Sequence, residues 1–141
     1  MSVEDVSING ASYGVYMNGG SATIHGLTVT GAYDYGIYVE NATATISDSI
    51  IRYSYGGIQL QGVTVVTQAL IERTKIISNS AYGLVVDNLG SAATARISDC
   101  VITGNNTGVA ATGGGQIITF RNNAWAGNST DGTTPFSISL K

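Results

Sequence analysis

The sequence predicts an all-β fold in which the chain winds into a solenoid of about six coils, with three short parallel strands in each coil. The first observation is a glycine followed by an apolar-x-apolar triplet, which returns every 21–26 residues, a period typical of stacked repeats. The second is that the segments between these glycines are rich in β-branched residues and alternate with a period of two. The third is that Gly, Asn, Ser and Thr separate the segments, which indicates turns. The recurring glycines are Gly14, Gly36, Gly57, Gly83 and Gly108.

Each coil is expected to contain three apolar anchors, one for each strand. A unit of this size cannot bury its own apolar face, so we expect successive coils to stack about 4.8 Å apart and to align like residues in inward columns. The first anchors are Val3, Ile24, Ile46, Ile71, Ile97 and, in a degenerate sixth copy, Phe120. The second anchors are Ile8, Val29, Ile51, Ile77, Ile102 and Trp125. The third anchors, directly after the glycines, are Val15, Ile37, Ile58, Leu84 and Val109.

These anchors predict a single domain over residues 1–141, with coils that start near residues 3, 21, 43, 68, 93 and 116. The recurring glycine is expected where the backbone turns sharply or adopts a positive φ. Cys100 falls in a column of mostly small residues with Val6 and Ser49. We therefore expect its thiol to be buried and to pack as a small hydrophobic group.

The composition excludes several classes of protein. The 141 residues are 43% hydrophobic and 11% charged, with a formal net charge of −3, which argues against both a nucleic-acid binder and a disordered chain. No apolar run approaches the ~20 residues that a membrane span needs. Cys100 and His25 are the only residues of their types, so no disulfide framework, Cys-based metal site or two-histidine scheme is expected. We accordingly expect no cofactor and no metal.

Two repeat units carry a resemblance to a known family. The segments Ala44–Ile51 and Ile97–Val109, with the tail segments Gly113–Ile117 and Gly127–Thr133, resemble the C-terminal coils of uncharacterised bacterial β-helix repeat proteins, within the pectate-lyase-like superfamily. The resemblance implies a right-handed, single-stranded parallel β-helix. Such relatives are usually longer and have an N-terminal cap. The chain is therefore expected to be the C-terminal part of a longer ancestor, or an unusually short free-standing version.

Location is read from the same resemblance and from the start of the chain. A longer parent would be extracellular or at the cell surface. Residues Met1–Asp5 are acidic and lack a signal-peptide pattern, so the chain as it stands would be cytoplasmic.

The two ends of the predicted solenoid differ. After Pro135, the apolar residues Phe136, Ile138 and Leu140 alternate with serines, which predicts a strand-like C-terminal cap over residues 133–141. The N-terminal rung has no comparable cover, and exposed strand edges can pair with another chain. We therefore expect a homo-oligomer, formed through the uncapped N-terminal rung or through the apolar Val63–Val66 loop.

Enzymes of the superfamily act on polysaccharides, but their motifs are absent here. The resemblance implies an Arg or Lys base with Asp-bound Ca²⁺ for lyases, and clustered aspartates with Gly-His-Gly and Arg-x-Lys for hydrolases. His25 is preceded by Ile24, and the carboxylates are too few for a Ca²⁺ site. Asp48, Arg73 and Asp99 are expected on successive rungs, where opposite charges stabilise neighbouring strands. We therefore expect no catalytic residue, and His25 as a surface residue beside a strand.

Tyrosines supply the candidate ligand-binding residues, which fall in one sector of the coil. One interpretation is a structural ladder of stacked rings, and the other is a platform that stacks sugar rings. The longer loops at Val63–Thr67 and Leu89–Ala93 are expected to protrude beside it and to wall a shallow groove. Tyr33 and Tyr53 lie near the same corner. The candidate residues are Tyr13, Tyr16, Tyr35, Tyr38, Tyr55 and Tyr82.

The function that these features favour is a non-catalytic β-helix module for carbohydrate binding or self-association. Its expected partners are a polysaccharide or glycan and a second copy of the chain, with no nucleic acid. Two alternatives stay open. One is a polysaccharide lyase or glycoside hydrolase-like enzyme with an unrecognised site, and the other is a structural spacer or truncated remnant of a longer β-helix protein.

Overall fold

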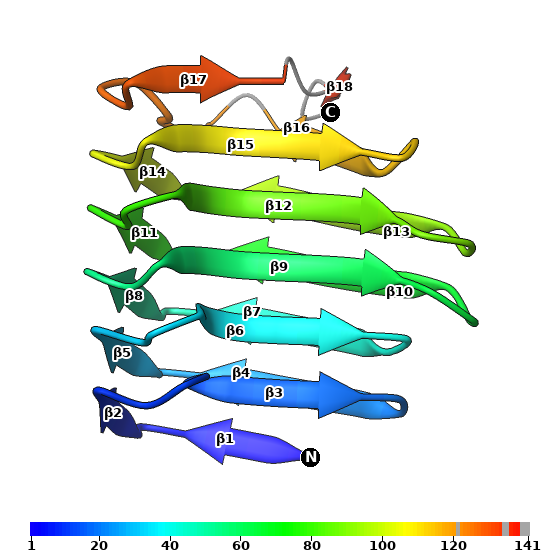
Figure 1. The fold of residues 1–141 in the computed structure, drawn as a ribbon, viewed down its shortest axis with the longest axis horizontal. Helices are drawn as coiled ribbons and strands as arrows, with labels where there is room; N and C mark the ends of the chain where they lie inside the picture. The colour runs from blue at the N-terminus through cyan, green and yellow to red at the C-terminus, as the bar shows by residue number, and fades with distance from the viewer. Residues whose placement is uncertain (121, 134–135, 139–141) are drawn as a thin grey trace.

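The chain forms a right-handed parallel β-solenoid, as the computed structural model shows for residues 1–120, 122–133 and 136–138 (Figure 1). Strands β3 (Val15–Asn18), β6 (Tyr35–Glu40) and β9 (Gly56–Gly62) run in one direction at the front, and β4 (Ser21–His25) and β7 (Thr43–Ser47) return behind them. The described residues contain no helix, and every strand pairing is parallel. The predicted all-β coil with three strands per turn is confirmed.

Three parallel sheets form the walls of the solenoid. Sheet A has seven strands: β1 (Ser2–Glu4), β4, β7, β10 (Thr67–Glu72), β13 (Ala93–Ser98), β16 (Gln116–Phe120) and β18 (Phe136–Ile138). Sheet B has five strands: β2 (Ser7–Asn9), β5 (Thr28–Thr30), β8 (Ile50–Arg52), β11 (Lys75–Ile77) and β14 (Val101–Thr103). Sheet C has six strands: β3, β6, β9, β12 (Tyr82–Asn88), β15 (Thr107–Thr112) and β17 (Thr130–Gly132).

The core consists of the predicted inward columns. In sheet A, Ile24, Ile46, Ile71 and Ile97 stand in register on successive strands and are fully buried. In sheet C, the matching column is Ile37, Ile58, Leu84 and Val109, also fully buried. Burial of one such side chain stabilises the fold by about 1.5–3 kcal/mol. The repeated columns therefore supply the main stabilising interaction of the solenoid.

Two predicted anchors were wrong by one residue. Ile76, not Ile77, pairs with Ile51 and Ile102 and is fully buried. The prediction counted back from Gly83, but the corner between sheets B and C varies in length, whereas two residues always separate sheets A and B. In the sixth copy Ile97 pairs with Thr119, which is buried, so Thr119 takes the position that was predicted for Phe120.

The recurring glycine has a different role from the predicted one. Gly14, Gly36, Gly57, Gly83 and Gly108 do not have a positive φ. A Cβ on Gly83 would lie 2.5 Å from the carbonyl oxygen of Gly108 and 2.6 Å from Cγ2 of Ile102. The glycine is required because the next coil and the second anchor approach its Cα closely, not because the backbone turns there.

Left-handed backbone begins two other corners of each coil, the one between sheets B and C, at Gly10, Gly31, Tyr53, Ser78 and Gly104, and the one between sheets A and B. The first residue of each two-residue corner has φ between 46° and 65°, and the second points inward. The inward residues Leu27, Ser49, Thr74 and Cys100 are all buried. The predicted burial of Cys100 is confirmed, and burial raises the pKa of its thiol. The left-handed residues of the corner between sheets A and B are Asp5, Gly26, Asp48, Arg73 and Asp99.

A ladder of buried amides, which the sequence analysis did not predict, stabilises the corner between sheets B and C. Oδ1 of Asn79 accepts the backbone N–H of Ser54 at 3.0 Å, and Oδ1 of Asn105 accepts that of Asn79 at 3.0 Å. Oδ1 of Asn128 accepts the N–H of Asn105 at 3.0 Å. Each amide thus links its own coil to the preceding one. A signal existed, because a Ser or Asn precedes the recurring glycine by three or four residues in coils three to five.

The two ends of the solenoid differ. At the C-terminal end, the backbone of β18 pairs in parallel with β16 and extends sheet A. The predicted cap over residues 133–141 depends on side chains that lie outside the described residues. At the N-terminal end, the first rung carries a hollow of about 580 Å³ lined by Val3, Val6, Ile8 and Val15, among others.

Candidate functional site

Three tyrosine rings pack together on the outer face of sheet C. Tyr13 lies just before β3, Tyr16 lies on β3, and Tyr38 lies on β6, in register with Tyr16. The ring centroids are 5.5 Å apart for Tyr13 and Tyr16, 5.6 Å for Tyr13 and Tyr38, and 5.3 Å for Tyr16 and Tyr38. These separations are in the range of favourable aromatic pairs.

Tyr35 and Tyr55 extend this cluster along the coil axis. The centroid of Tyr35 lies 6.1 Å from that of Tyr38 and 6.1 Å from that of Tyr55, with edge-to-face geometry. Tyr35 is buried, and its ring occupies the space that a Cβ on Gly56 would need. Burial raises the pKa of Tyr35, with neighbouring Tyr55 and Tyr82 adding to the shift. Tyr82, the last of the six predicted residues, lies on β12, where it pairs with Gly56 of β9 and is half-buried.

The structure therefore brings five of the predicted tyrosines into one chain of ring contacts, with Tyr82 in the neighbouring coil. We call this surface the tyrosine face. It consists of Tyr13, Tyr16, Tyr35, Tyr38, Tyr55 and Tyr82.

The phenol groups of the tyrosine face donate to carboxylates and amides. The Tyr13 hydroxyl donates to Oδ2 of Asp34 at 2.6 Å, and this hydrogen bond raises the pKa of Tyr13 to about 12. The Tyr16 hydroxyl donates to Oε2 of Glu40 at 3.4 Å, and the Tyr38 hydroxyl donates to Gln61. Burial raises the pKa of Tyr38 to about 12, with the charge of Glu40 adding to the shift. The phenols of Tyr13 and Tyr38 thus remain protonated near neutral pH.

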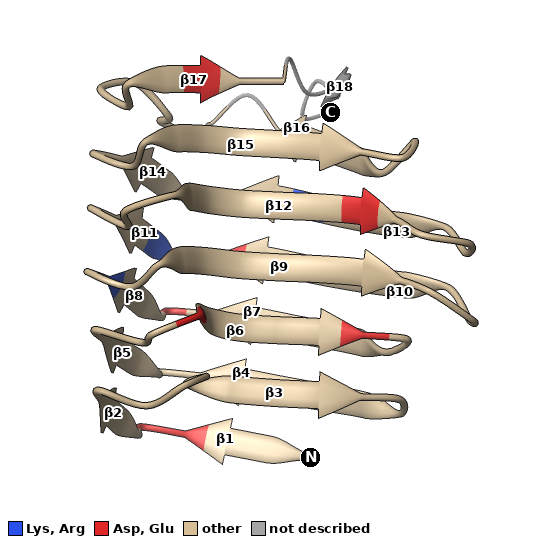
Figure 2. Ribbon diagram, in the orientation of Figure 1, with Lys and Arg blue, Asp and Glu red and all other residues tan. Residues whose placement is uncertain are grey.

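The strands of sheet C carry acidic side chains and no basic ones among the described residues. Figure 2 shows Asp and Glu on the front strands, while the described Lys and Arg lie on sheets A and B and the corner between them. Asp34 and Glu40 flank the tyrosine face at the two ends of β6, and Asp87 lies on β12. The tyrosine face therefore has a negative potential.

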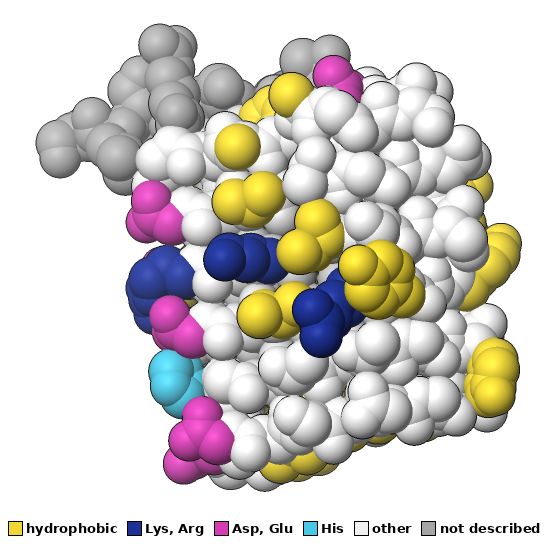
Figure 3. All heavy atoms as spheres, turned by 90° about the vertical axis from the view of Figure 1, so that its left-hand side faces the viewer, with side chains coloured by type: hydrophobic (Ala, Val, Ile, Leu, Met, Phe, Trp, Pro, Cys, Tyr) yellow, Lys and Arg dark blue, Asp and Glu magenta, His cyan; other side chains and the backbone are white. Residues whose placement is uncertain are grey.

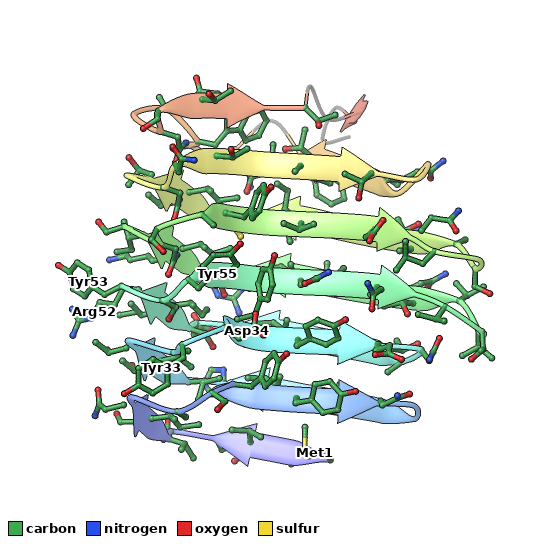
Figure 4. All side chains as sticks on the ribbon, viewed as in Figure 1. Met1, Tyr33, Asp34, Arg52, Tyr53 and Tyr55 are labelled. Carbon is green, nitrogen blue, oxygen red and sulfur yellow. The ribbon has the colours of Figure 1, made fainter. Side chains whose placement is uncertain are left out.

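The corner between sheets B and C carries two more tyrosines, outside the ring cluster. Tyr33 and Tyr53 are 79% and 64% exposed, and Figure 4 shows them at the side of the coil. The guanidinium carbon of Arg52 lies 5.8 Å from the centroid of Tyr53, a cation–π contact. Neither ring belongs to the contact chain of the tyrosine face.

The predicted charge column lies at the corner between sheets A and B. Nε and Nη2 of Arg73 donate to the two carboxylate oxygens of Asp48 at 2.9 and 2.8 Å, and His25 approaches Asp48 at 3.4 Å. The Arg73 guanidinium holds the pKa of Asp48 below its usual value. Asp99 instead accepts from Asn122 at 2.8 Å. Figure 3 shows the charged side chains stacked along one edge, where they act as structural ion pairs between rungs.

The two long loops extend from the corner between sheets C and A. Val65, Val66 and Leu89 are each at least half exposed there. Oδ1 of Asn41 accepts three backbone N–H groups of the first loop, from residues 63, 64 and 65, at 3.1, 2.8 and 3.2 Å. A second hollow, of about 130 Å³, lies on the outer face of sheet A beside Arg96 rather than between these loops.

The side chains that favour soft metal ions are dispersed. Cys100 is buried, and its thiol donates to the carbonyl oxygens of Ile71 and Ser98. His25 is exposed on β4, and Met17 is buried on β3. Among residues 1–120 and 122–133, no three His, Cys, Asp or Glu side chains gather in a metal-binding arrangement. None of the described segments forms a helix long and apolar enough to cross a membrane.

One comparison with known proteins identifies a family. No curated protein and no solved structure matches the chain. The family model described as "Periplasmic copper-binding protein (NosD)" matches residues 1–135. Copper favours thiolate, thioether and imidazole ligands, and the described part of the chain gathers no three His, Cys, Asp or Glu side chains that would fit such a site. The match extends over nearly the whole solenoid, and the chain therefore belongs to the NosD family of β-helix repeat proteins.

Proposed function

We propose that this chain is a non-catalytic β-helix module that binds carbohydrate on its tyrosine face. The observation that carries the proposal is the chain of ring contacts from Tyr13 to Tyr55, which crosses three coils of sheet C. Aromatic rings stack on the apolar faces of sugars, and phenols and carboxylates bond to their hydroxyls. The resemblance to pectate-lyase-like proteins, whose enzymes act on polysaccharides, supports the same ligand class.

Exposure divides the tyrosine face into contact residues and supports. Tyr16 and Tyr55 are 50% and 48% exposed, so about half of each ring is open to a ligand. Tyr35 is buried between Tyr38 and Tyr55 and holds their rings in place. A rigid aromatic surface loses little side-chain entropy when it binds, which favours recognition of a flat ligand.

Two carboxylates beside the tyrosine face are suited to binding the hydroxyls of a ligand. Asp34 accepts the Tyr13 hydroxyl, and Glu40 accepts Nδ2 of Asn18 and of Asn41, each at 3.1 Å. Both carboxylates are thus held in place by protein donors, and their remaining lone pairs can accept hydrogen bonds from a ligand.

The test is a titration with neutral oligosaccharides of five or more sugars. Binding is measured by calorimetry and by NMR signals of the tyrosine rings. Tyr16→Ala should weaken binding about tenfold, since it removes about 1.5 kcal/mol of aromatic contact. Tyr33→Ala is the matched control, because Tyr33 is more exposed and lies outside the ring cluster. Equal affinities of both variants and the parent protein, or no binding of any sugar at millimolar concentration, would overturn the proposal.

Self-association is a second candidate, because two apolar surfaces of the described chain are exposed. One is the pair of loops that carry Val65, Val66 and Leu89, and the other is the hollow at the first rung. Exposed apolar patches on a protein surface often mark contact sites. Light scattering at increasing concentration should show a dimer that Val65→Ser with Leu89→Ser dissociates. A mass of 14.5 kDa at every concentration would contradict this candidate.

A further inference from the structure

The part of the tyrosine face formed by Tyr13, Tyr16 and Tyr38 offers mainly hydrogen-bond acceptors. The hydroxyl protons of Tyr13, Tyr16 and Tyr38 are already donated to Asp34, Glu40 and Gln61. Nδ2 of Asn18 and of Asn41 likewise donates to Glu40. The remaining lone pairs of the phenols and carboxylates can only accept. A ligand on this surface must therefore bring its own donors.

Charge narrows the choice of ligand further. The six strands of sheet C contain no Lys or Arg, and the described cations lie on the other two walls of the solenoid. Asp34 and Glu40 lie at opposite ends of β6, roughly 20 Å apart along the strand at about 3.3 Å per residue. An anionic sugar would be repelled at both ends, whereas a cationic one would be attracted at both.

The rings add a second attraction for positive charge. The face of a tyrosine ring attracts an ammonium group through its quadrupole, most strongly when a carboxylate lies nearby. Tyr13 lies beside Asp34 and Tyr16 beside Glu40, so each carboxylate has a ring within hydrogen-bond distance. The centroids of the three rings are 5.3–5.6 Å apart, so the rings pack as one surface on which a ligand can lie.

We propose that the tyrosine face selects oligosaccharides that carry protonated amino groups, of the glucosamine type, over neutral sugars and uronic-acid polymers. This inference rests on the proposed carbohydrate-binding function and specifies its ligand class. The amino groups pair with Asp34 and Glu40 while the sugar rings lie on Tyr13, Tyr16 and Tyr38. The spacing of the two carboxylates requires an oligomer several sugars long.

Three pentasaccharides of similar length test the proposal by calorimetry: glucosamine, N-acetylglucosamine and galacturonate. The first two share the same sugar ring and differ at its nitrogen, which is a charged amine in glucosamine and a neutral acetamide in the acetylated form. The glucosamine pentamer should bind at least tenfold more tightly than its acetylated form, and the galacturonate pentamer should bind least. Glu40→Gln should weaken glucosamine binding about fivefold, the factor that one charge contact near 4 Å gives in water. Binding of the acetylated pentamer should barely change.

Asp99→Asn is the matched control, because it removes one carboxylate from the opposite side of the solenoid and should leave every affinity unchanged. Equal binding of the charged and acetylated pentamers would overturn the amine preference but leave carbohydrate binding standing. Failure of all three sugars would overturn both proposals. A ring-free polyamine that binds as tightly as the glucosamine pentamer would also contradict the inference, since charge alone would then be recognised.

Discussion

The buried amide ladder gives the sharpest prediction about stability. Asn105 is 1% exposed, and its Oδ1 accepts both the backbone N–H of Asn79 at 3.0 Å and Nδ2 of Asn79 at 2.9 Å. Its Nδ2 donates to the carbonyl oxygen of Ile76 at 3.0 Å. Its Nδ2 also donates to the carbonyl oxygen of Thr103 and to Oδ1 of Asn128. Asn105→Ala removes all five hydrogen bonds and leaves the backbone donor of Asn79 buried without its partner.

The expected cost follows from these contacts. An unsatisfied buried donor costs about 1–3 kcal/mol. The side-chain donor Nδ2 of Asn79 also loses its hydrogen bond to Oδ1 of Asn105. We expect Asn105→Ala to lower the free energy of unfolding by about 3 kcal/mol and the melting temperature by roughly 10 °C. Asn106→Ala is the control, because the next residue is exposed and should change the free energy of unfolding by less than about 0.5 kcal/mol.

The protein is unfolded by heat and by urea. Circular dichroism reports unfolding of the whole solenoid, and Trp125 fluorescence reports unfolding of the neighbouring coil. Trp125 packs against the core in the coil after Asn105, so its signal reports local loosening. If both signals give Asn105→Ala a free energy of unfolding within about 1 kcal/mol of the parent protein, the amide ladder does not stabilise the coils.

Three other predictions concern the glycine column, the charge column and the buried thiol. Gly83→Ala should lower the free energy of unfolding by about 2–3 kcal/mol, because its Cβ would collide with the next coil. Gly10→Ala is the control, because open space surrounds Gly10 and the substitution should cost only about 1 kcal/mol of backbone strain. Equal losses of the two variants in urea unfolding would contradict the steric explanation. Arg73 lowers the pKa of Asp48, so the stability that Asp48 adds is present above its unfolded pKa of about 4 and is lost as the pH falls through the lower folded value. Melting temperatures between pH 5 and pH 2 should therefore fall less steeply for Asp48→Asn, and identical slopes would refute the assignment. Burial raises the pKa of the Cys100 thiol, so a thiol reagent at pH 8 should react with it only after denaturant is added; rapid labelling of the folded protein would show that the thiol is accessible.

The sequence was sufficient for the architecture because the anchors recur and a coil can bury them in only one way. Ile24, Ile46 and Ile71 were placed correctly, because each lies 11 or 12 residues before the recurring glycine. Ile77 was misplaced for the complementary reason, because it was counted across a corner whose length varies. Alignment on Asn79 and Asn105 would have selected Ile76, because each of these amides follows its second anchor by three residues.

The tyrosine face was predictable as a sector but not as a set of contacts. Spacing relative to the recurring glycine placed Tyr13, Tyr35 and Tyr55 near one corner. The burial of Tyr35 depends on the missing side chain of Gly56, two coils from Tyr13, and the pairing of Tyr13 with Asp34 depends on an extra residue in the second coil. Such contacts arise from side-chain packing between coils, which a single repeat unit does not encode.

The corner between sheets C and A changes in length without disturbing the strands that it joins, whereas the corner between sheets A and B stays at two residues. Two residues join β3 to β4 and β6 to β7, whereas four join β9 to β10 and β12 to β13, and the registers on both sides are unchanged. Peptide insertion should therefore be tolerated between Gly62 and Thr67. A foreign epitope or a protease site grafted there would be displayed on a rigid support, and the same graft between Glu72 and Lys75 would interrupt the coil.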